Sequence, residues 1–313
     1  MLELRVPSLA FDKEAYRRRF AAEADAPRQI NTPCRVYVDD NEYPSVVYCE
    51  LDEKLPALVE ACKSMKYGVT HRTQGLRTRS KTFGYMPAAP VYQQDACRVV
   101  QMAHEYPQQH AVLCSSAKLL SALYEKHNPK VFMEHLEKTK VVVDNYKLSN
   151  TPFTSGVVNK DTQIAYHYDT GNFKDVWSNM FTFKEHVIGG NLTCPQLGLT
   201  FMLRDHSVLM FDGQNVLHGV TPFVKTRPSG HRYTIVYYSL QKMWKCLPPA
   251  KEIARADKKQ RELTMLRVEP VEGEAGQLRA LSYEQYSVAI GKHMANKKQR
   301  QRKPAASADD DAV

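Results

Sequence analysis

The chain has 313 residues, 43% of them apolar, which is enough to bury a complete core in one large domain or two smaller ones. No stretch approaches the roughly 20 consecutive apolar residues that a membrane-spanning helix needs, so we expect no membrane partner. The formal net charge is +9, and residues 61–94 carry six Lys or Arg without any Asp or Glu, a concentration that favours a polyanion-binding surface but also fits a solvated basic face.

The N-terminal half combines short strands with helices. Residues 1 to about 50 contain the strand-like pieces CRVYV and SVVYCEL between polar turns. Apolar residues then recur with helical spacing over 55–64, 110–127 and 131–142, and an Asn-Pro pair ends the second run. We assign residues 1–70 to a mixed segment that packs on the core of the protein.

The N-terminus and the cysteines predict a cellular compartment. The first residues include acidic side chains and no long apolar run before a small-residue cleavage site, so we expect no signal peptide. The seven cysteines are scattered and never spaced as CxxC, which favours reduced thiols over a disulfide framework. We therefore expect a cytoplasmic location in a bacterial or phage-infected cell, or a nuclear one in a eukaryote.

From about residue 152 the pattern becomes that of a β-protein. Short apolar or alternating runs such as QIAYHYD, VWSNMFTF and RYTIVYYSL follow one another between turn sequences, as in a sandwich or jelly roll. We assign residues 71–247 to a catalytic domain with helical support and residues 248–294 to a helical extension, with an amphipathic helix over 252–266. Residues 295–313 are low in apolar residues and are expected to form a disordered charged tail.

Two histidines and an aspartate in the β-rich half form the strongest chemical signal. His167 and Asp169 are two positions apart, so on an extended strand their side chains point to the same face. His218 follows 49 residues after Asp169, in the strand-like run NVLHGV. Two imidazoles and one carboxylate on one side of an octahedron are the facial triad that binds Fe(II) and leaves three positions open.

An arginine further along the chain completes the pattern. Arg232 lies 14 residues beyond His218, and Thr234 follows on the same face of the predicted strand. A planar guanidinium suits the distal carboxylate of a dicarboxylate cosubstrate such as 2-oxoglutarate, and a neighbouring hydroxyl can share it. Each element alone is more often structural than functional, but the order of all four in one β-rich region is specific.

These residues lie in sequence blocks that resemble the TET/JBP family of dioxygenases, in particular its phage, bacterial and fungal branch. The blocks are GNFKDVWSNM, FDGQNVLHGVTP and HRYTIVYYSLQKMW, and the upstream RSKTFGYMPAAP and HAVLCSSAKLL extend the resemblance over roughly residues 78–247. The resemblance implies an α+β fold in which a double-stranded β-helix (jelly-roll) core is braced by N-terminal and C-terminal helices. It places the family's iron ligands on His167, Asp169 and His218 and its 2-oxoglutarate arginine on Arg232.

The resemblance also implies the reaction. Members of the family use Fe(II), 2-oxoglutarate and O₂ to hydroxylate the 5-methyl group of pyrimidines in nucleic acid, so we expect DNA as the partner. A methyl group inside a duplex must reach a buried iron, which requires extrusion of the base. The chain departs from the family where the FGYxP block, which continues with further arginines in related sequences, reads PAAPVYQQD. No contact is predicted from that block.

Candidate contacts follow from position relative to the triad. Asn159 and Asn179, on flanking strands, are predicted to meet the C1 carboxylate of the cosubstrate or the edge of the base, although Asn on a strand is more often structural. The predicted substrate contacts are aromatic residues for stacking, a polar loop at the rim and basic residues for phosphate: Tyr168, Phe173 and Trp177; Lys174 and Asp175; and Arg77, Arg79 and Lys81. Aromatic residues beside a strand are, however, more often part of the core.

Two other functions remain open at this stage. The same chemistry would serve a hydroxylase of a small molecule or of a protein side chain. A non-catalytic module that binds modified DNA is the second alternative, but such a module has no need of the four site residues. The sequence makes no prediction about cytosine against thymine derivatives or about oligomeric state.

Overall fold

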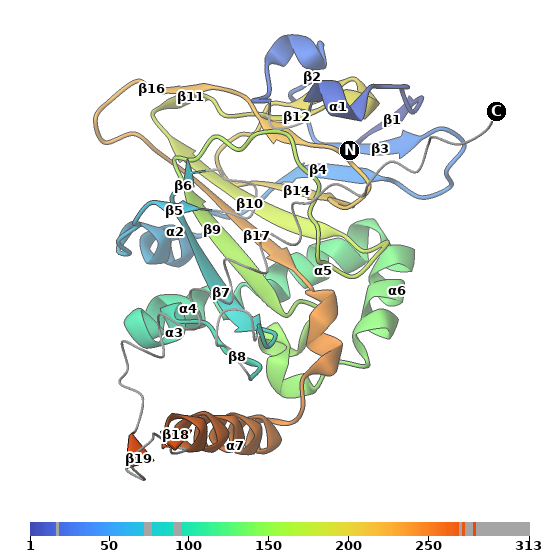
Figure 1. Ribbon diagram of the computed structural model, residues 1–313. Helices are drawn as coiled ribbons and strands as arrows, with labels where there is room; N and C mark the ends of the chain where they lie inside the picture. The colour runs from blue at the N-terminus through green and yellow to red at the C-terminus, as the bar shows by residue number, and fades with distance from the viewer. Residues whose placement is uncertain (17–18, 72–76, 90–95, 269–270, 273–277, 280–313) are drawn as a thin grey trace, which may run out of the picture. The chain divides into compact units, whose positions relative to one another are not determined.

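The structure is a computed structural model (Figure 1). It describes residues 1–16, 19–71, 77–89, 96–268, 271–272 and 278–279. The chain divides into two compact units, Met1–Glu252 and Ile253–Val313. Helix α7 (Pro249–Val268) confirms the helix predicted over 252–266, and the strands β18 (Val271–Glu272) and β19 (Leu278–Arg279) pair in the second unit. The predicted charged tail lies outside the described residues.

A sheet of nine strands forms the centre of the first unit. Its order is β1-β3-β4-β14-β10-β17-β9-β7-β8, and all neighbours are antiparallel except β1 and β3. The strands are β1 (Leu2–Val6), β3 (Cys34–Val38), β4 (Val46–Glu50), β7 (Ser80–Met86), β8 (Arg98–Val99), β9 (Ser155–Lys160), β10 (Ser178–Glu185), β14 (Ser207–Phe211) and β17 (His231–Tyr238). The N-terminal segment thus contributes three strands to the same sheet as the candidate site.

A smaller sheet faces part of the large one. It contains β15 (Gly219–Val220), β12 (Leu192–Cys194), β13 (Leu199–Phe201) and β2 (Arg28–Ile30), in that order. Apolar side chains of both sheets, among them Leu209, Phe211, Leu192 and Phe201, form one buried cluster between them. Among the described residues, two short ribbons, β11 (Val187–Gly189) with β16 (Phe223–Lys225) and β5 (Thr70–His71) with β6 (Arg77–Thr78), are the remaining strands of this unit. The arrangement is the predicted jelly-roll core.

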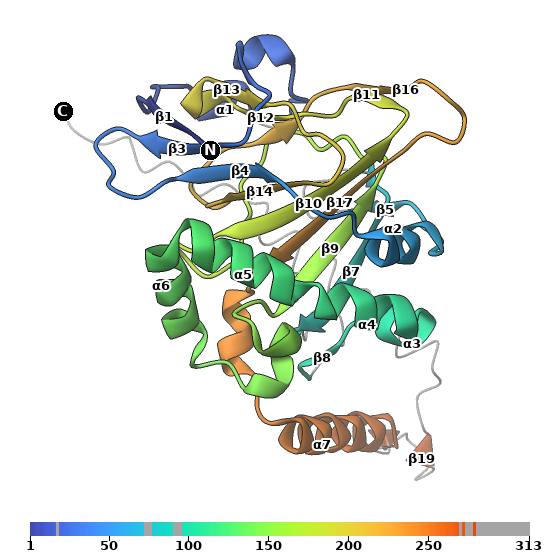
Figure 2. The ribbon, with the colours of Figure 1, turned by 180° about the vertical axis from the view of Figure 1, so that it is seen from behind.

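Helices cover the other face of the large sheet (Figure 2). They are α2 (Pro56–Lys63), α3 (Met102–Glu105), α4 (Pro107–Ser115), α5 (Ala117–His127) and α6 (Pro129–Thr139). Their apolar faces pack against Phe83, Phe181 and Tyr237 of the sheet in a second buried cluster. Among the described residues the short helices are α1 (Lys13–Tyr16) and the 3₁₀ turns Glu23–Asp25, Asp144–Tyr146, Leu148–Asn150, Pro195–Leu197 and Gln241–Lys245. The α+β prediction is confirmed.

The helix predicted over 110–127 is two helices. Helix α4 ends at Ser115 and α5 begins at Ala117. The hydroxyls of Ser115 and Ser116 both donate to the carbonyl of Val112, at 3.0 and 2.8 Å. Serine side chains that bond to the backbone in this way compete with helix continuation, which explains the break.

The prediction of reduced cysteines is wrong for one pair. Cys97 and Cys246 form a disulfide although 149 residues separate them. Spacing along the chain does not reveal this pair, because the fold alone brings the segment before β8 next to the segment after β17. Cys34, Cys49, Cys62, Cys114 and Cys194 are free thiols. Burial raises the pKa of the Cys62 thiol to about 12, so it is protonated at neutral pH. None of the described helices is long and apolar enough to cross a bilayer.

Candidate active site

The two histidines of the predicted triad meet through their backbones. His167 and His218 form an isolated antiparallel bridge, in which the amide of each donates to the carbonyl of the other, at 3.0 and 3.2 Å. The strand predicted around His167 is therefore only this bridge. The bridge brings the imidazole centroids to 4.3 Å although the residues lie far apart in the chain.

Backbone carbonyls orient both imidazoles. Nδ1 of His167 lies 2.9 Å from the carbonyl oxygen of Ala165, and Nδ1 of His218 lies 2.9 Å from that of Val216. A carbonyl can only accept, so Nδ1 carries the proton and Nε2 presents a lone pair. Metal-binding histidines commonly have this arrangement, in which a second hydrogen bond fixes the tautomer and the ring.

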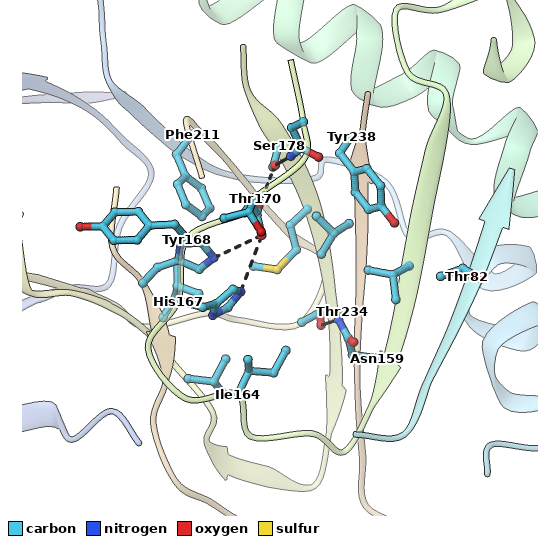
Figure 3. A pocket seen from close by; sticks show the side chains of 18 of the residues that line it. Thr82, Asn159, Ile164, His167, Tyr168, Thr170, Ser178, Phe211, Thr234 and Tyr238 are labelled. Carbon is cyan, nitrogen blue, oxygen red and sulfur yellow. Dashed lines mark hydrogen bonds and ion pairs between the residues drawn. The ribbon is translucent and has the colours of Figure 1, made fainter. Parts of the chain in front are cut away.

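The carboxylate of Asp169 faces both Nε2 atoms. Its Oδ1 lies 3.6 Å from Nε2 of His167 and 3.9 Å from Nε2 of His218, and the three potential ligand atoms all lie within 4.8 Å of one another. Oδ2 accepts a hydrogen bond of 2.8 Å from the hydroxyl of Ser178 on β10 (Figure 3). This donor set, two imidazole nitrogens and one carboxylate oxygen, fits a ferrous ion.

The triad lines a cavity of about 390 Å³ between the two sheets. The cavity extends from His167, Asp169 and His218 to Arg232 and Thr234 on β17, so all the residues of the predicted pattern lie around one space. Much of the remaining wall is apolar, including Ile164, Leu192 and Val220. A volume of this size accommodates a small dicarboxylate together with part of a second ligand.

Arg232 lies fully inside the protein, with 1% of its surface exposed. Its Nε donates to the carbonyl of Gly190 at 3.0 Å, while Nη2 is buried and has no hydrogen-bond partner among the described residues. Gly190 has a positive φ of 68°, and a Cβ there would lie 2.7 Å from Nε of Arg232. Burial lowers the pKa of Arg232 to about 10, with Asp161 acting in the opposite direction. A buried cation with a free donor fits an anionic ligand, because an unsatisfied buried donor is costly.

A hydrogen-bonded chain reaches the cavity beside Arg232. The hydroxyl of Ser80 donates to Oδ1 of Asn159 at 2.7 Å, and Nδ2 of Asn159 lies 3.3 Å from the hydroxyl of Thr234. The Asn159 amide therefore donates to Thr234, which leaves the hydrogen of Thr234 for a ligand. Thr182 pairs with Thr234 across the sheet, and its buried hydroxyl has no partner among the described residues.

Comparison with known proteins identifies the family. The model of the TET/JBP family, described as the oxygenase domain of the 2OGFeDO superfamily, matches residues 85–241, which is half of the chain. The chain belongs to the TET/JBP family. It is therefore a dioxygenase of the type that depends on Fe(II) and 2-oxoglutarate, and the donor set and the buried arginine described above fit these groups.

Individual relatives within the family are distant. The chain is 25% identical over 164 residues to the "bifunctional helicase and thymine dioxygenase JBP2" of Leishmania major. The aligned region covers 52% of this chain and 15% of the relative. The protein of the same name from Trypanosoma brucei brucei is 30% identical over 122 residues, or 39% of this chain and 11% of the relative. The matched region is thus a small part of either relative.

A solved structure shows the same fold. The structure of NgTET1 in complex with 5mC DNA superposes with a TM-score of 0.53 at 15% sequence identity, and the match covers 75% of this chain and 86% of that one. This agreement supports the jelly-roll assignment of the first unit.

The predicted contacts beside the triad do not all lie at the cavity. Tyr168 lines it, and Asn159 does so on the cosubstrate side. Trp177 instead stacks on Tyr124, with centroids 5.3 Å apart and planes at 10°, in the cluster below the helices. Phe173 packs in another buried cluster with Cys97 and Met243. These two aromatic residues occupy core positions, so the geometry does not support their predicted stacking on a base.

Asn179 points away from the triad. Its neighbours Ser178 and Met180 line the cavity, and strand alternation places Asn179 on the opposite, helix-covered face. Both amide atoms are buried without a hydrogen-bond partner among the described residues. The predicted contact with cosubstrate or base is therefore incompatible with this position.

The charged residues predicted to contact substrate differ in exposure and in ion pairing. Lys174 is exposed, and Asp175 pairs with Lys138, 3.4 Å apart. Lys81 forms a salt bridge of 2.9 Å with Glu105 on the helix-covered face, so the structure does not place it beside the cavity. Arg79 is exposed, and the side chain of Arg77 lies outside the described residues.

Several residues that line the cavity were missed in the sequence. The hydroxyl of Ser178 donates to Asp169, and the side chain of Asn172 donates to Ser178. The cavity is also lined by Thr82 and Met86 on β7 and by Tyr238 on β17. Strand alternation from Arg232 would have identified Tyr238, because it continues the series Arg232, Thr234, Val236. No pattern in the sequence relates Ser178 to Asp169.

Proposed function

We propose that this chain hydroxylates the 5-methyl group of a pyrimidine, thymine or 5-methylcytosine, in DNA. The observation that carries the proposal is the convergence of His167, Asp169 and His218 on one cavity with the buried guanidinium of Arg232. Membership of the TET/JBP family supports the class of substrate, as do relatives named as thymine dioxygenases. The net charge of +9 also suits a polyanionic partner.

In this proposal the triad binds the ferrous ion. Nε2 of His167, Nε2 of His218 and Oδ1 of Asp169 would hold the ion, and the side chains of His167 and Asp169 are 15% and 24% exposed. All three side chains line the cavity, so cosubstrate and O₂ would reach the ion from there. The carbonyls of Ala165 and Val216 hold the imidazoles in the required tautomer.

Arg232 and Thr234 bind the distal carboxylate of 2-oxoglutarate. Nη2 of Arg232 supplies the free charged donor, and the Thr234 hydroxyl supplies a neutral one that Asn159 has oriented. The apolar wall from Ile164, Leu192 and Val220 excludes water from the chain of the cosubstrate. In such surroundings a charge-assisted hydrogen bond is stronger than in water.

The bound iron supplies oxidative chemistry: 2-oxoglutarate, O₂ and the methyl group yield succinate, CO₂ and a hydroxymethyl group. The residues of this chain hold the methyl group near the open side of the triad and fix its orientation. Tyr168, Thr82, Met86 and Tyr238 also line the cavity, and in this proposal they contact the extruded base. Extrusion costs a few kcal/mol, which contacts to the base and phosphates must offset.

Mass spectrometry of nucleosides tests this function. The protein is incubated aerobically with Fe(II), 2-oxoglutarate and DNA that contains thymine and 5-methylcytosine, and the DNA is then digested. The proposal expects 5-hydroxymethyl derivatives of one of these bases, absent when 2-oxoglutarate is omitted or when His167→Ala replaces the parent. Succinate release without a modified nucleoside would contradict DNA as the substrate and leave the small-molecule or protein hydroxylase as the alternative. A cytoplasmic or nuclear location stays a prediction.

A further inference from the structure

Asp169 is restrained on the side that faces away from the histidines. Oδ1 points toward both imidazoles, whereas Oδ2 accepts the hydrogen bond from Ser178, a residue with 2% of its surface exposed. The two oxygens of the carboxylate thus have separate partners. A carboxylate in this state offers a metal one oxygen rather than two.

The hydroxyl of Ser178 is itself oriented by a neighbour. Nδ2 of Asn172 donates to Oγ of Ser178 at 3.1 Å, and the carbonyl of Asn172 accepts from the side chain of Gln214. Because the amide of Asn172 occupies a lone pair of Oγ, the single hydrogen of the hydroxyl is directed to Asp169. Asn172 and Ser178 are both buried, so water does not compete for these bonds.

Gly213 closes the remaining side of the carboxylate. A Cβ at this position would lie 2.3 Å from Oδ2 and 2.9 Å from Cγ of Asp169, and its three nearest atoms would all belong to Asp169. The carbonyl of Gly213 also accepts the amide of Asp169 at 2.7 Å. The glycine is therefore a wall against which the carboxylate rests, and any larger residue would displace it.

We propose that Ser178 is a positioning residue that keeps Asp169 monodentate, with Gly213 as the wall behind the carboxylate. This inference rests on the proposed role of the triad. An octahedral ion with three single-atom ligands retains three open positions, two for the keto acid and one for O₂. A bidentate carboxylate would take one of these positions. Ser178 donates a hydrogen bond to Oδ2, so Oδ2 does not compete for one of these positions.

Metal binding without catalysis provides the test. The metal-free protein is titrated with Mn(II), and the unbound ion is measured by electron paramagnetic resonance. Loss of a hydrogen bond to a metal ligand typically costs about 10–100-fold in metal affinity or activity, and we expect Ser178→Ala to weaken Mn(II) binding within this range. The affinity of the Mn(II)-loaded protein for 2-oxoglutarate should fall as well, because the freed Oδ2 competes for a position.

Matched variants separate this role from packing. Ser178→Thr keeps the hydroxyl on a strand that tolerates threonine and should restore Mn(II) binding to within about threefold of the parent. Ser207→Ala removes another fully buried serine hydroxyl, which donates to the carbonyl of Arg204 at 2.7 Å, and should leave Mn(II) binding unchanged. Gly213→Ala, which places a Cβ against the Asp169 carboxylate, should weaken Mn(II) binding even if Ser178→Ala fails to fold.

The outcomes distinguish this inference from the proposed function. Mn(II) binding by Ser178→Ala that equals the parent, or loss of binding in Ser207→Ala to the same extent, would overturn the positioning role. Mn(II) binding that is unaffected by His167→Ala would overturn the triad and this inference together. A protein whose Mn(II) affinity depends on His167 and Ser178, but which does not oxidise DNA, would support the positioning role and contradict only the substrate.

Discussion

The two faces of the large sheet differ in chemistry although the same strands build both. On β17 the cavity face carries Arg232, Thr234 and Tyr238, whereas the helix-covered face carries Ile235 and Tyr237 in the apolar cluster. On β10 the division is the same, with Ser178 toward Asp169 and Phe181 toward the helices. The alternation of side-chain direction along a strand therefore separates residues that face the ligand cavity from residues that pack in the core.

This comparison predicts that substitutions on one face alter binding and catalysis while those on the other alter stability. The cavity face contains buried polar groups that only a ligand would satisfy, such as Nη2 of Arg232. Most residues of the helix-covered face belong to the apolar cluster, and among the described residues Asn179 is buried there without a hydrogen-bond partner. Four substitutions, in order of expected effect, test how far the division holds.

The largest effect is expected for Asp169→Ala. Removal of the carboxylate leaves two imidazoles without the anionic ligand of the proposed triad, so succinate formation should fall below detection. The unfolding temperature should change far less than the activity, because the side chain lies at the cavity and is 24% exposed. Substantial succinate release by Asp169→Ala would contradict the proposed metal site.

Arg232→Ala should weaken cosubstrate binding greatly. A hydrogen bond to a charged group contributes about 1.5–3 kcal/mol, so the concentration of 2-oxoglutarate for half-maximal rate should rise roughly 10–100-fold. Arg232→Lys keeps the charge without the planar fork and should recover part of the loss. Titration of succinate formation with 2-oxoglutarate measures both, and an unchanged requirement in Arg232→Ala would contradict the assignment.

Asn179→Leu should stabilise the protein. The amide is buried without partners on an apolar face, and such a group costs about 1–3 kcal/mol, so an apolar side chain of similar volume should raise the unfolding free energy by roughly 1 kcal/mol. Chemical denaturation measures the change, with 2-oxoglutarate affinity as the control. A large loss of that affinity would instead support the contact predicted from the sequence.

The smallest expected effect is the pH dependence of 2-oxoglutarate affinity that Lys184 causes. Burial, and then repulsion from Arg232, lowers the pKa of Lys184 to about 8, while Asp205 opposes the shift. Below that pH the ammonium group adds positive charge near Arg232, and above it the charge is lost. The affinity for dianionic 2-oxoglutarate should therefore fall about two- to fivefold between pH 7 and 9.

Calorimetric titration of the Mn(II)-loaded protein with 2-oxoglutarate measures this pH dependence. Lys184→Met lacks the titrating group and should show a flatter profile. In the parent, Nζ of Lys184 donates to the carbonyl of Gly189, and Lys184 does not line the cavity. The variant therefore removes the charge of Lys184 without removing a residue that contacts the ligand. The same slope in Lys184→Met as in the parent would assign the pH dependence to another group.

The sequence by itself determined the class of fold and the residues of the proposed triad. Periodic apolar spacing identified the helices and the β-rich half, because side-chain direction repeats along an element whatever lies around it. The histidines, Asp169 and Arg232 were recognisable because their chemical types and order are rare together. Local pattern was sufficient for each of these predictions.

Only the tertiary structure decided which neighbouring residues serve the site. It placed Trp177 and Asn179 on the helix-covered face, joined Cys97 to Cys246, and brought Ser178 and Gly213 against Asp169. These contacts join segments whose separation in the chain carries no signal. They depend on strand pairing and on which face of a strand is buried, and both are settled by packing of the whole sheet rather than by any single segment.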